Sequence, residues 1–278
     1  MKGRKLEVAV ISDIHLATHA CKADNVLKYL KSIHPSILVL NGDIIDSWRF
    51  SRSYFPKAHL KVVRQLIKMM EKGINVFYIS GNHDEFLRKF NHTEIGNLRI
   101  MNQLMLELDG QKTWIFHGDI FDHIIHRAKW LAKTGAATYG LLTVINKLLN
   151  AVIVKVGFRK ITIYDSIKKK LVKEKTPLNR FESMVTQLAA ERGCQTVICG
   201  HTHVPREKHV LLDKGMVHYI NCGDWVDHFT AAEYADGQWS LFHFEDQSTD
   251  SLADEPDIPD KRQIYHSLFR ELAFANIR

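Results

Sequence analysis

Five short stretches of the sequence combine Asp, His and Asn, the side chains that bind hard and borderline metal ions. Each follows a short apolar run rich in β-branched or aromatic residues, which predicts that each lies in a loop where a strand ends. The five stretches are Asp13-Ile14-His15, Gly42-Asp43-Ile44-Ile45-Asp46, Gly81-Asn82-His83-Asp84, His117-Gly118-Asp119 and Gly200-His201-Thr202-His203. Any one of them could be an ordinary turn, but five in succession indicate a site for Mn, Fe, Zn or Mg.

Two of these stretches carry donors at positions i and i+2. In an extended chain such side chains leave the same face, so Asp13 with His15, and His201 with His203, can converge on one ion or on two neighbouring ions. Two dications about 3.5–4 Å apart repel strongly and need a shared anionic ligand. Asp43 is the best candidate for that bridging ligand. The sequence therefore predicts two divalent ions, with Mn as the expected metal.

The five stretches resemble the pattern of the calcineurin-like metallophosphoesterases, which is D-x-H, G-D-x-x-D, G-N-H-D/E, H and G-H-x-H in that order. The resemblance covers residues 7–225. It implies that one metal is held by Asp13, His15, Asp43 and His203, and the second by Asp43, Asn82, His117 and His201. It also implies that His83 is an acid or a phosphate-binding imidazole, and that Asp46 orients it.

Such a site predicts hydrolysis of a phosphoric ester or anhydride by a hydroxide that bridges the two ions, because two dications lower the pKa of the water between them. The ions also neutralise charge on the phosphoryl oxygens. Asn82 would hold a metal without adding charge that repels phosphate. His83, oriented by Asp46, would bind the phosphoryl group or donate a proton to the leaving oxygen.

Three longer segments resemble the branch that contains the UDP-2,3-diacylglucosamine pyrophosphohydrolases of lipid A synthesis. They are Asn41-Gly-Asp-Ile-Ile-Asp-Ser-Trp48, His117-Gly-Asp-Ile-Phe-Asp122 followed by Lys129-Trp130-Leu131, and Asn221-Cys-Gly-Asp-Trp-Val226. This resemblance implies a metal-dependent hydrolase that cleaves a nucleotide-lipid diphosphate into UMP and a lipid sugar 1-phosphate. One residue departs from the branch, because those hydrolases typically carry Arg where His83 stands.

His83 keeps a second function open. An alkoxide leaves poorly without an acid, which His supplies, whereas a sugar phosphate leaving from a diphosphate needs little protonation. The alternative is therefore a metal-dependent phosphodiesterase or phosphatase acting on soluble nucleotides or other phosphoesters. A third class, a non-catalytic scaffold, is disfavoured because all seven ligand positions are filled.

The composition is that of a soluble globular protein, with 45% hydrophobic and 25% charged residues among 278. Four cysteines without a C-x-x-C spacing are typical of a reducing compartment. The apolar run after the basic N-terminus is too short for a signal peptide, and Leu141–Val156 falls short of the ~20 residues of a membrane span. We therefore expect a cytoplasmic protein, with peripheral contact to the cytoplasmic face of the inner membrane as an option.

The net charge of +7 is concentrated between residues 155 and 180, where nine basic residues accompany two acidic ones. A surface of this kind favours partners that carry phosphate, such as a nucleotide, an anionic lipid surface or nucleic acid. Aromatic residues do not interleave the basic run densely enough for a platform that stacks single strands, so nucleic acid is the least expected partner. A solvated helix face is the alternative explanation of the basic run.

The predicted elements that position these stretches form two runs of strands. Apolar runs predict strands at 6–11, 36–41, 74–80, 104–108, 113–117, 196–200, 208–212, 217–221, 228–234 and 238–244. Helices are predicted at 22–32 and at 57–72, the second with one apolar stripe made of Leu60, Val63, Leu66, Ile67 and Met70. Strand runs separated by helices predict an α/β (α+β) chain with two packed sheets flanked by helices. This agrees with the four-layer α/β/β/α sandwich that the resemblance implies.

A helical insertion, or cap, is predicted at about 122–192, between His117 and the His201/His203 pair, where it must overhang the metal site. Helices that are apolar around most of their circumference are buried or face lipid, and such a cap would suit a substrate with acyl chains and a diphosphate. The expected substrate-binding residues are Asn82, His83, Trp130, Tyr139, Leu141, Leu142 and Ile145. The alternative is a helical hairpin that buries its apolar residues on itself.

The chain is expected to divide into a metallophosphoesterase domain at 1–245, an acidic linker at 246–260 and an amphipathic helix at 261–278. In the last segment Ile264, Leu268 and Leu272 recur every four residues. That helix can dock on the domain, pair with another subunit or lie on a membrane, and the sequence leaves these three options open.

Overall fold

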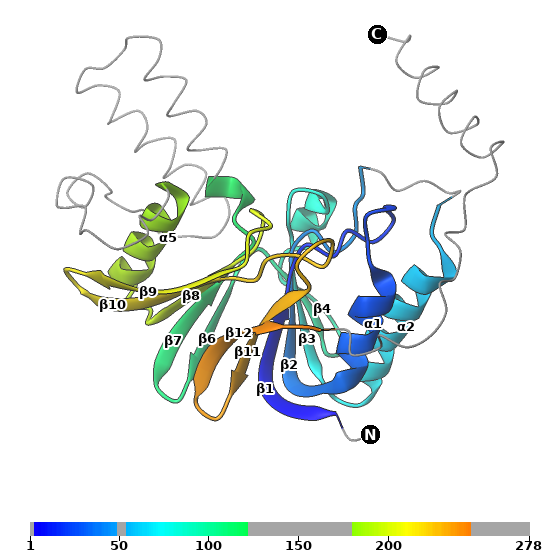
Figure 1. Ribbon diagram of the computed structural model, residues 1–278, viewed down its shortest axis with the longest axis horizontal. Helices are drawn as coiled ribbons and strands as arrows, with labels where there is room; N and C mark the ends of the chain where they lie inside the picture. The colour runs from blue at the N-terminus through cyan, green and yellow to red at the C-terminus, as the bar shows by residue number, and fades with distance from the viewer. Residues whose placement is uncertain (1–2, 49–53, 122–179, 246–278) are drawn as a thin grey trace, which may run out of the picture. The chain divides into compact units, whose positions relative to one another are not determined.

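The computed structural model of the chain describes residues 3–48, 54–121 and 180–245 (Figure 1). All of them except Glu245 belong to the first of two compact units, Met1–Phe244, and the second unit is Glu245–Arg278. Most of the predicted cap, the acidic linker and the C-terminal helix lie outside the described residues. The same holds for five of the expected substrate-binding residues, Trp130, Tyr139, Leu141, Leu142 and Ile145.

One sheet has seven strands in the order β12-β11-β1-β2-β3-β5-β4. Its centre is parallel and consists of β1 (Arg4–Ile11), β2 (Ile33–Asn41), β3 (Asn75–Ile79) and β5 (Leu98–Met101). Its edges pair antiparallel and consist of β4 (Thr93–Ile95), β11 (Thr230–Ala235) and β12 (Gln238–His243). The continuous apolar runs of β1 and β2 fit this central position, because parallel strands are covered on both faces.

The second sheet has five strands in the order β6-β7-β8-β10-β9. Its three central strands, β7 (Gln111–Ile115), β8 (Thr196–Cys199) and β10 (Gly215–Asn221), are parallel. The edge strands β6 (Leu104–Leu108) and β9 (Arg206–Leu212) pair antiparallel with their neighbours. Residues far apart in the sequence, such as those of β7 and β8, therefore end side by side.

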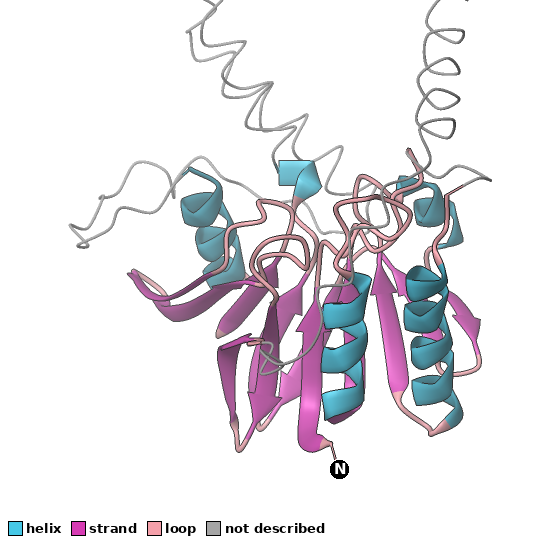
Figure 2. Ribbon diagram, turned by 45° about the vertical axis from the view of Figure 1, so that its right-hand side comes forward, coloured by secondary structure: helices cyan, strands magenta, loops and turns pink. Residues whose placement is uncertain are grey.

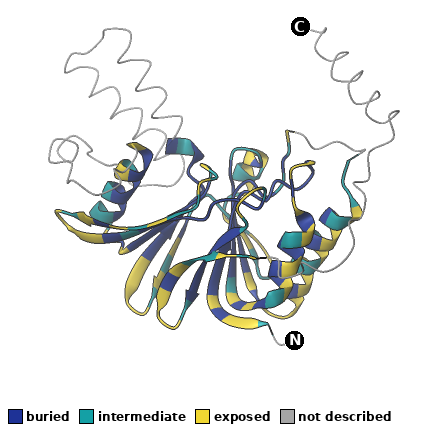
Figure 3. Ribbon diagram, in the orientation of Figure 1, coloured by how far each residue is buried: buried dark blue, intermediate teal, exposed yellow. Residues whose placement is uncertain are grey.

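Helices cover the outer faces of the two sheets. The helices α1 (Ala23–Ser32) and α2 (Lys57–Glu71) share one apolar core with β1 and β2, and α5 (Arg180–Glu191) shares a second with β8 and β10. A third core lies between the sheets, where Val8 and Val39 meet Ile115 and Ile198. Figure 3 shows buried residues along the strands between the layers and exposed residues at the hairpin turns. The predicted four-layer α/β/β/α sandwich is confirmed.

Three short elements were not predicted from the sequence: β4, β5 and the 3₁₀ helix η1 (Glu85–Phe90). The strand β5 is only four residues long and is held by its parallel pairing with β3. The local sequence of β5 does not predict this pairing. The predicted stripe on α2 is partly wrong, because Leu60 is 55% exposed and Ile67 is 49% exposed. The helix instead buries His59, Val62 and Met69 against the sheet.

The loops that follow the carboxyl ends of the parallel strands gather at one edge of the sandwich (Figure 2). Strands β1, β2 and β3 of the first sheet and β7 and β8 of the second all end there, each directly before one of the five polar stretches. In α/β sheets this edge is where ligands bind. None of the described helices combines the length and the apolar character that a membrane crossing requires.

Candidate metal centre

The backbone at this edge adopts an unusual conformation. Five of the predicted ligands have a positive φ: Asp13 (54°), His15 (53°), Asp43 (54°), His201 (66°) and His203 (60°). A left-handed conformation in a residue other than glycine costs about 1–3 kcal/mol and persists only where the surroundings enforce it. The prediction that the D-x-H and H-x-H pairs are extended is therefore wrong, although the side chains still reach the site.

Hydrogen bonds between neighbouring loops enforce this conformation. The backbone N–H of Asp13 donates to Gly42 O at 3.1 Å, and that of His15 donates to Asp43 O at 2.9 Å. The same parallel pairing continues from Leu16 to Ile44, so the loops after β1 and β2 are joined beyond the ends of their strands. The positions of the Asp13 and Asp43 side chains are thus fixed relative to one another.

Two glycines in the polar stretches are required by close approach. A Cβ atom on Gly81 would lie 2.2 Å from Oδ1 of Asp43, and one on Gly200 would lie 1.9 Å from Oγ of Ser12 and 2.6 Å from Oδ2 of Asp13. Real Cβ atoms do not tolerate such distances. The backbone of both loops therefore packs directly against the carboxylates at the centre of the site.

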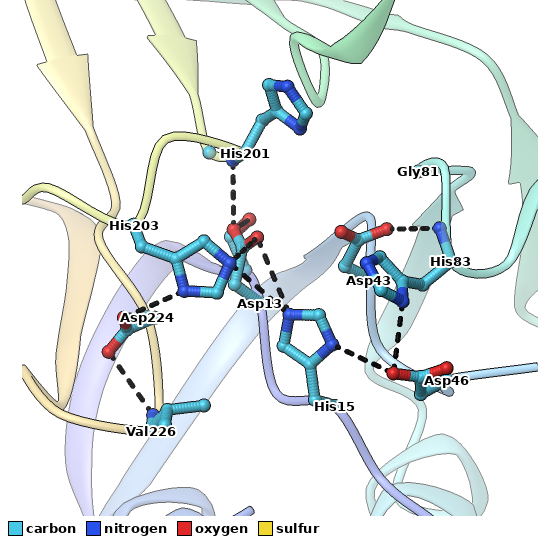
Figure 4. A network of polar contacts seen from close by, with 12 residues as sticks. Asp13, His15, Asp43, Asp46, Gly81, His83, His201, His203, Asp224 and Val226 are labelled. Atoms are coloured by element: carbon cyan, nitrogen blue, oxygen red, sulfur yellow. Dashed lines mark hydrogen bonds and ion pairs between the residues drawn. The ribbon is translucent and has the colours of Figure 1, made fainter. Parts of the chain in front are cut away.

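The first group of donors is Asp13, His15 and His203 (Figure 4). Oδ1 of Asp13 lies 3.3 Å from Nε2 of His203 and 4.0 Å from Nε2 of His15, and the two nitrogens lie 3.4 Å apart. Ligand atoms around one ion at about 2.1 Å are roughly 3–3.4 Å apart. Burial raises the pKa of Asp13 to about 6 and lowers the pKa of His15 to about 4, which keeps this imidazole neutral.

The second group is Asp43, His117 and His201. Nε2 of His117 lies 3.3 Å from Oδ2 of Asp43, and its Nδ1 donates to the backbone carbonyl of Asn41 at 2.8 Å. Burial acts to lower the pKa of His117, but the carboxylates of Asp43 and Asp13 outweigh it and raise this pKa to about 10. Without a metal, His117 therefore keeps its proton strongly, because the positive charge neutralises these carboxylates. A bound cation would neutralise the same carboxylates.

A third group joins His15, Asp43 and His83. Asp43 therefore belongs to two groups, and its Oδ1 also accepts the backbone N–H of His83 at 2.8 Å. His201 and His203 fall into different groups, so the H-x-H pair serves two neighbouring positions rather than one. Burial acts to raise the pKa of Asp43, but the charge of His117 and the hydrogen bond from the backbone N–H of His83 hold this pKa well below its usual range.

Buried atoms in these loops are suited to divalent ions. Oδ1 of Asp13, Oδ1 of Asn82 and Nε2 of His117 are buried and make no hydrogen bond within the described part of the chain. Buried polar groups without partners are costly unless a ligand satisfies them. Carboxylate and amide oxygens together with imidazole nitrogens are donors for Mn, Fe, Zn or Mg. The residues present therefore fit a metal centre.

His83 lies at the margin of this centre. Its Nδ1 is 3.0 Å from Oδ2 of Asp46, and the same oxygen is 3.7 Å from Nδ1 of His15. The ring of Trp48, which is 62% exposed, lies over His83 at 4.3 Å between centroids. The structure therefore brings the predicted pair of His83 and Asp46 together, beside an aromatic surface.

Sequence reasoning assigned no role to three polar residues that support the site. Asp224 contacts Nδ1 of His203 at 2.9 Å, and Arg88 donates to Asp119 at 2.6 Å. Ser12 donates toward Asp13 and Asn41. The motif Asn221–Val226 contains Asp224, so the sequence marks this residue. It does not show that Asp224 contacts His203.

Known proteins resemble this chain over most of its length. The UDP-2,3-diacylglucosamine hydrolase of Aliivibrio fischeri is 29% identical over 247 residues, which are 85% of this chain and 98% of that protein. The hydrolase of the same name from Neisseria meningitidis is 24% identical over 248 residues, covering 84% and 95%. That from Pectobacterium carotovorum is 25% identical over 221 residues, covering 77% and 89%.

A family model described as calcineurin-like phosphoesterase matches residues 6–205. This range contains all five strand-end stretches and every donor of the three groups, from Asp13 to His203. It also covers more than half of the chain. The protein belongs to the calcineurin-like phosphoesterases.

Proposed function

We propose that this phosphoesterase hydrolyses the diphosphate of a UDP-2,3-diacylglucosamine-type substrate to UMP and a lipid sugar 1-phosphate. The observation that carries the proposal is the 29% identity to the hydrolase of that name along 98% of its length. That similarity extends past residue 205, where the family model ends, and so is not confined to the stretches that all metallophosphoesterases share. A pyrophosphatase of the lipid A pathway is the corresponding role.

Members of this family use two divalent ions, and we propose the ligands from the family pattern together with the donor groups. One ion would be held by Asp13, His15, Asp43 and His203, and the other by Asp43, Asn82, His117 and His201. Asp43 shares one group with His117 and His201 and another with His15, a proposed ligand of the other ion, which supports its role as the bridge. When bound, two such ions lower the pKa of water and neutralise charge on the phosphoryl oxygens. Mn is the proposed metal, with Fe, Zn and Mg as the alternatives.

The residues around the ions have separate roles in the proposal. Asn82 is neutral and adds no charge that would repel the diphosphate. His83 keeps Nδ1 toward Asp46 at 3.0 Å, so Nε2 remains to bind a phosphoryl oxygen or to donate a proton to the leaving group. The ring of Trp48 lies 4.3 Å from the imidazole between centroids and adds an aromatic surface beside it.

A second candidate is a phosphodiesterase or phosphatase that acts on soluble phosphoesters. The contact between His83 and Asp46 favours it, because an imidazole held by a carboxylate is a suitable acid for an alkoxide leaving group. A diphosphate substrate has a better leaving group and gains less from such an acid. Hydrolysis rates on a panel of substrates distinguish the pyrophosphatase from the phosphodiesterase or phosphatase.

The surroundings of the substrate are proposed from the sequence. The domain at 1–245 would carry the cap that the sequence predicts at about 122–192, and Trp130, Tyr139, Leu141, Leu142 and Ile145 of that cap would line a site for acyl chains. The protein would act in the cytoplasm, in peripheral contact with an anionic membrane that supplies the nucleotide lipid. Nucleic acid is not a proposed partner. The acidic linker and the C-terminal helix have no assigned role.

The test is release of UMP or phosphate from a panel of substrates with Mn. The panel contains a diacylated UDP-glucosamine, UDP-N-acetylglucosamine, a nucleoside monophosphate and an alkyl phosphodiester. The proposal expects UMP from the diacylated compound at a kcat/KM well above that of UDP-N-acetylglucosamine. Preference for the alkyl diester, or no UMP from the diacylated compound, would favour the second candidate.

A further inference from the structure

Asp224 lies outside all three donor groups but contacts a member of one of them. It follows β10, its side chain is 1% exposed, and its Oδ2 lies 2.9 Å from Nδ1 of His203 (Figure 4). The backbone N–H of the next residue, Trp225, donates to Asp13 O at 3.1 Å. The loop that carries Asp224 is thus attached to the loop that carries Asp13.

The second carboxylate oxygen of Asp224 is fully engaged. Oδ1 accepts the backbone N–H groups of Val226 at 3.2 Å, Asp227 at 2.9 Å and His228 at 2.9 Å. It also lies 3.3 Å from Nδ1 of His228. These contacts fix the rotation of the carboxylate, so Oδ2 can face only toward His203.

This arrangement determines where His203 carries its proton. An ionised carboxylate accepts hydrogen bonds and cannot donate them, so Nδ1 of His203 must be the protonated nitrogen. In the neutral imidazole Nε2 then keeps its lone pair, and it is this nitrogen that lies 3.3 Å from Oδ1 of Asp13 and 3.4 Å from Nε2 of His15. A carboxylate behind a histidine also makes that histidine a stronger ligand.

His117 has a different support. Its Nδ1 donates to the backbone carbonyl of Asn41, which no substitution removes and which carries no net charge. The imidazoles of His203 and His117 are therefore supported differently, one by a buried carboxylate and one by a peptide group. Of these two supports, that of His203 can be changed by replacing a side chain.

We propose that Asp224 is a positioning residue that fixes the Nδ1-protonated tautomer of His203 and thereby sets the metal affinity of the position shared with Asp13 and His15. This inference rests on the proposed ligation of metal by His203. It assigns to Asp224 no contact with the substrate. It predicts that the two metal positions respond differently to the loss of this carboxylate.

The decisive variant is Asp224→Asn. The amide oxygen can still accept the backbone N–H groups of Val226, Asp227 and His228, and the amide nitrogen then faces His203 and donates to Nδ1. The proton of His203 must move to Nε2, which removes the lone pair that would bind metal. Asp227→Asn is the matched control, because Asp227 is exposed and its replacement changes the net charge equally.

Two measurements decide the inference. In Mn titrations by calorimetry, Asp224→Asn should weaken one of two positions by roughly 10–100-fold and leave the other within about twofold, while Asp227→Asn matches the wild type. In ¹⁵N-histidine NMR of the metal-free protein, at a pH high enough that the His203 imidazole is neutral, His203 should be protonated at Nδ1 in the wild type and at Nε2 in Asp224→Asn.

A wild-type His203 protonated at Nε2 would overturn the inference, even if the variant failed to fold. Unchanged Mn affinity at both positions of a folded Asp224→Asn variant would do so as well. A wild type that binds no Mn would instead contradict the proposed function, and the NMR measurement would still decide whether Asp224 sets the tautomer.

Discussion

Oδ2 of Asp46 lies 3.0 Å from Nδ1 of His83, which joins His15 and Asp43 in the third donor group, whereas Asp46 belongs to none of the three groups. The carboxylate faces Nδ1 of the imidazole, and we propose that Nε2 meets the substrate. A His in this place can supply a proton, whereas the Arg that the sequence resemblance leads one to expect there would supply only charge. The choice between these residues therefore reports on the leaving group.

Replacing His83 separates the two roles. His83→Ala should leave the Mn content at two per chain and should reduce hydrolysis of alkyl esters by about 10²–10⁴-fold, the range for a lost general acid. Esters with acidic leaving groups should lose far less. The measurement is kcat/KM across a series of leaving-group pKa values, and an equal loss along the series would contradict the acid role.

His83→Arg is the matched variant for the same series. Arginine keeps a positive charge beside the phosphoryl group but does not donate a proton near neutral pH. Relative to His83→Ala, the His83→Arg variant should restore hydrolysis of the diphosphate, while hydrolysis of the alkyl esters should stay slow. Restored hydrolysis of both substrates would show that positive charge alone accounts for the contribution of His83 to catalysis.

Replacing Gly81 tests the close packing around Asp43. A Cβ on Gly81→Ala would lie 2.2 Å from Oδ1 of Asp43, so this carboxylate must move and Mn affinity should fall by at least about tenfold. Gly73→Ala is the control, since Gly73 has a φ of +85° with open space around its Cβ position. The control should lose about 1 kcal/mol of stability and bind Mn normally. Equal Mn affinity in both variants would contradict the packing argument.

The place of the ligands could be predicted from the sequence, but their backbone conformation could not. Polar stretches after apolar runs locate Asp13 and Asp43 at strand ends, since strands and their ends are local properties of a sequence. The positive φ of Asp13 comes from pairing with the loop at Gly42, which is 29 residues away, and an extended conformation was expected instead.

Contacts between segments that are distant in the sequence also explain the other differences between the predicted and the observed structure. The role proposed for Asp224 depends on its contact with His203, and the sequence of segment 221–226 alone does not reveal that contact. Leu60 and Ile67 fit a helical stripe, but the angle at which α2 packs on the sheet leaves them exposed and buries His59 instead. Contacts between distant segments decide each of these features.

The metal-free protein should lose stability as the pH rises. The pKa of His117 is about 10 in the folded protein and about 6.5 unfolded, so its contribution is complete below pH 6.5 and is lost as the pH rises toward 10. Between pH 7 and 9 the free energy of unfolding should fall by about 1.4 kcal/mol per pH unit more than in His117→Gln. Urea unfolding with EDTA measures this difference, and parallel pH profiles would contradict the raised pKa.

Added Mn should reverse this trend. A metal ligand must be deprotonated, so Mn competes with the proton on His117 and binds more tightly as the pH rises. The stabilisation by Mn should therefore grow from pH 6.5 to 9 in the wild type. The growth should be weaker in His117→Gln, and a pH-independent effect of Mn would exclude His117 as a ligand.

Replacing apolar residues of the cap tests the substrate class. If Leu141, Leu142 and Ile145 hold acyl chains, changing them to Ser should lower kcat/KM for a diacylated UDP-glucosamine by tens-fold or more, since each buried methylene contributes roughly 0.8 kcal/mol. A small chromogenic ester should be hydrolysed at an unchanged rate because the metal ligands are untouched. Equal losses on both substrates would mean that these residues only stabilise the fold.

The central claim is that two ions bridged by Asp43 cleave a nucleotide-lipid diphosphate. Its most direct test is UMP release from a diacylated UDP-glucosamine with Mn, comparing the wild type with Asp43→Ala. We predict robust release by a wild type that holds two Mn, and a loss of about a thousandfold or more with reduced Mn content in the variant. A folded Asp43→Ala protein that keeps two Mn and near wild-type turnover would contradict the bridge, and a wild type that releases no UMP would contradict the proposed substrate.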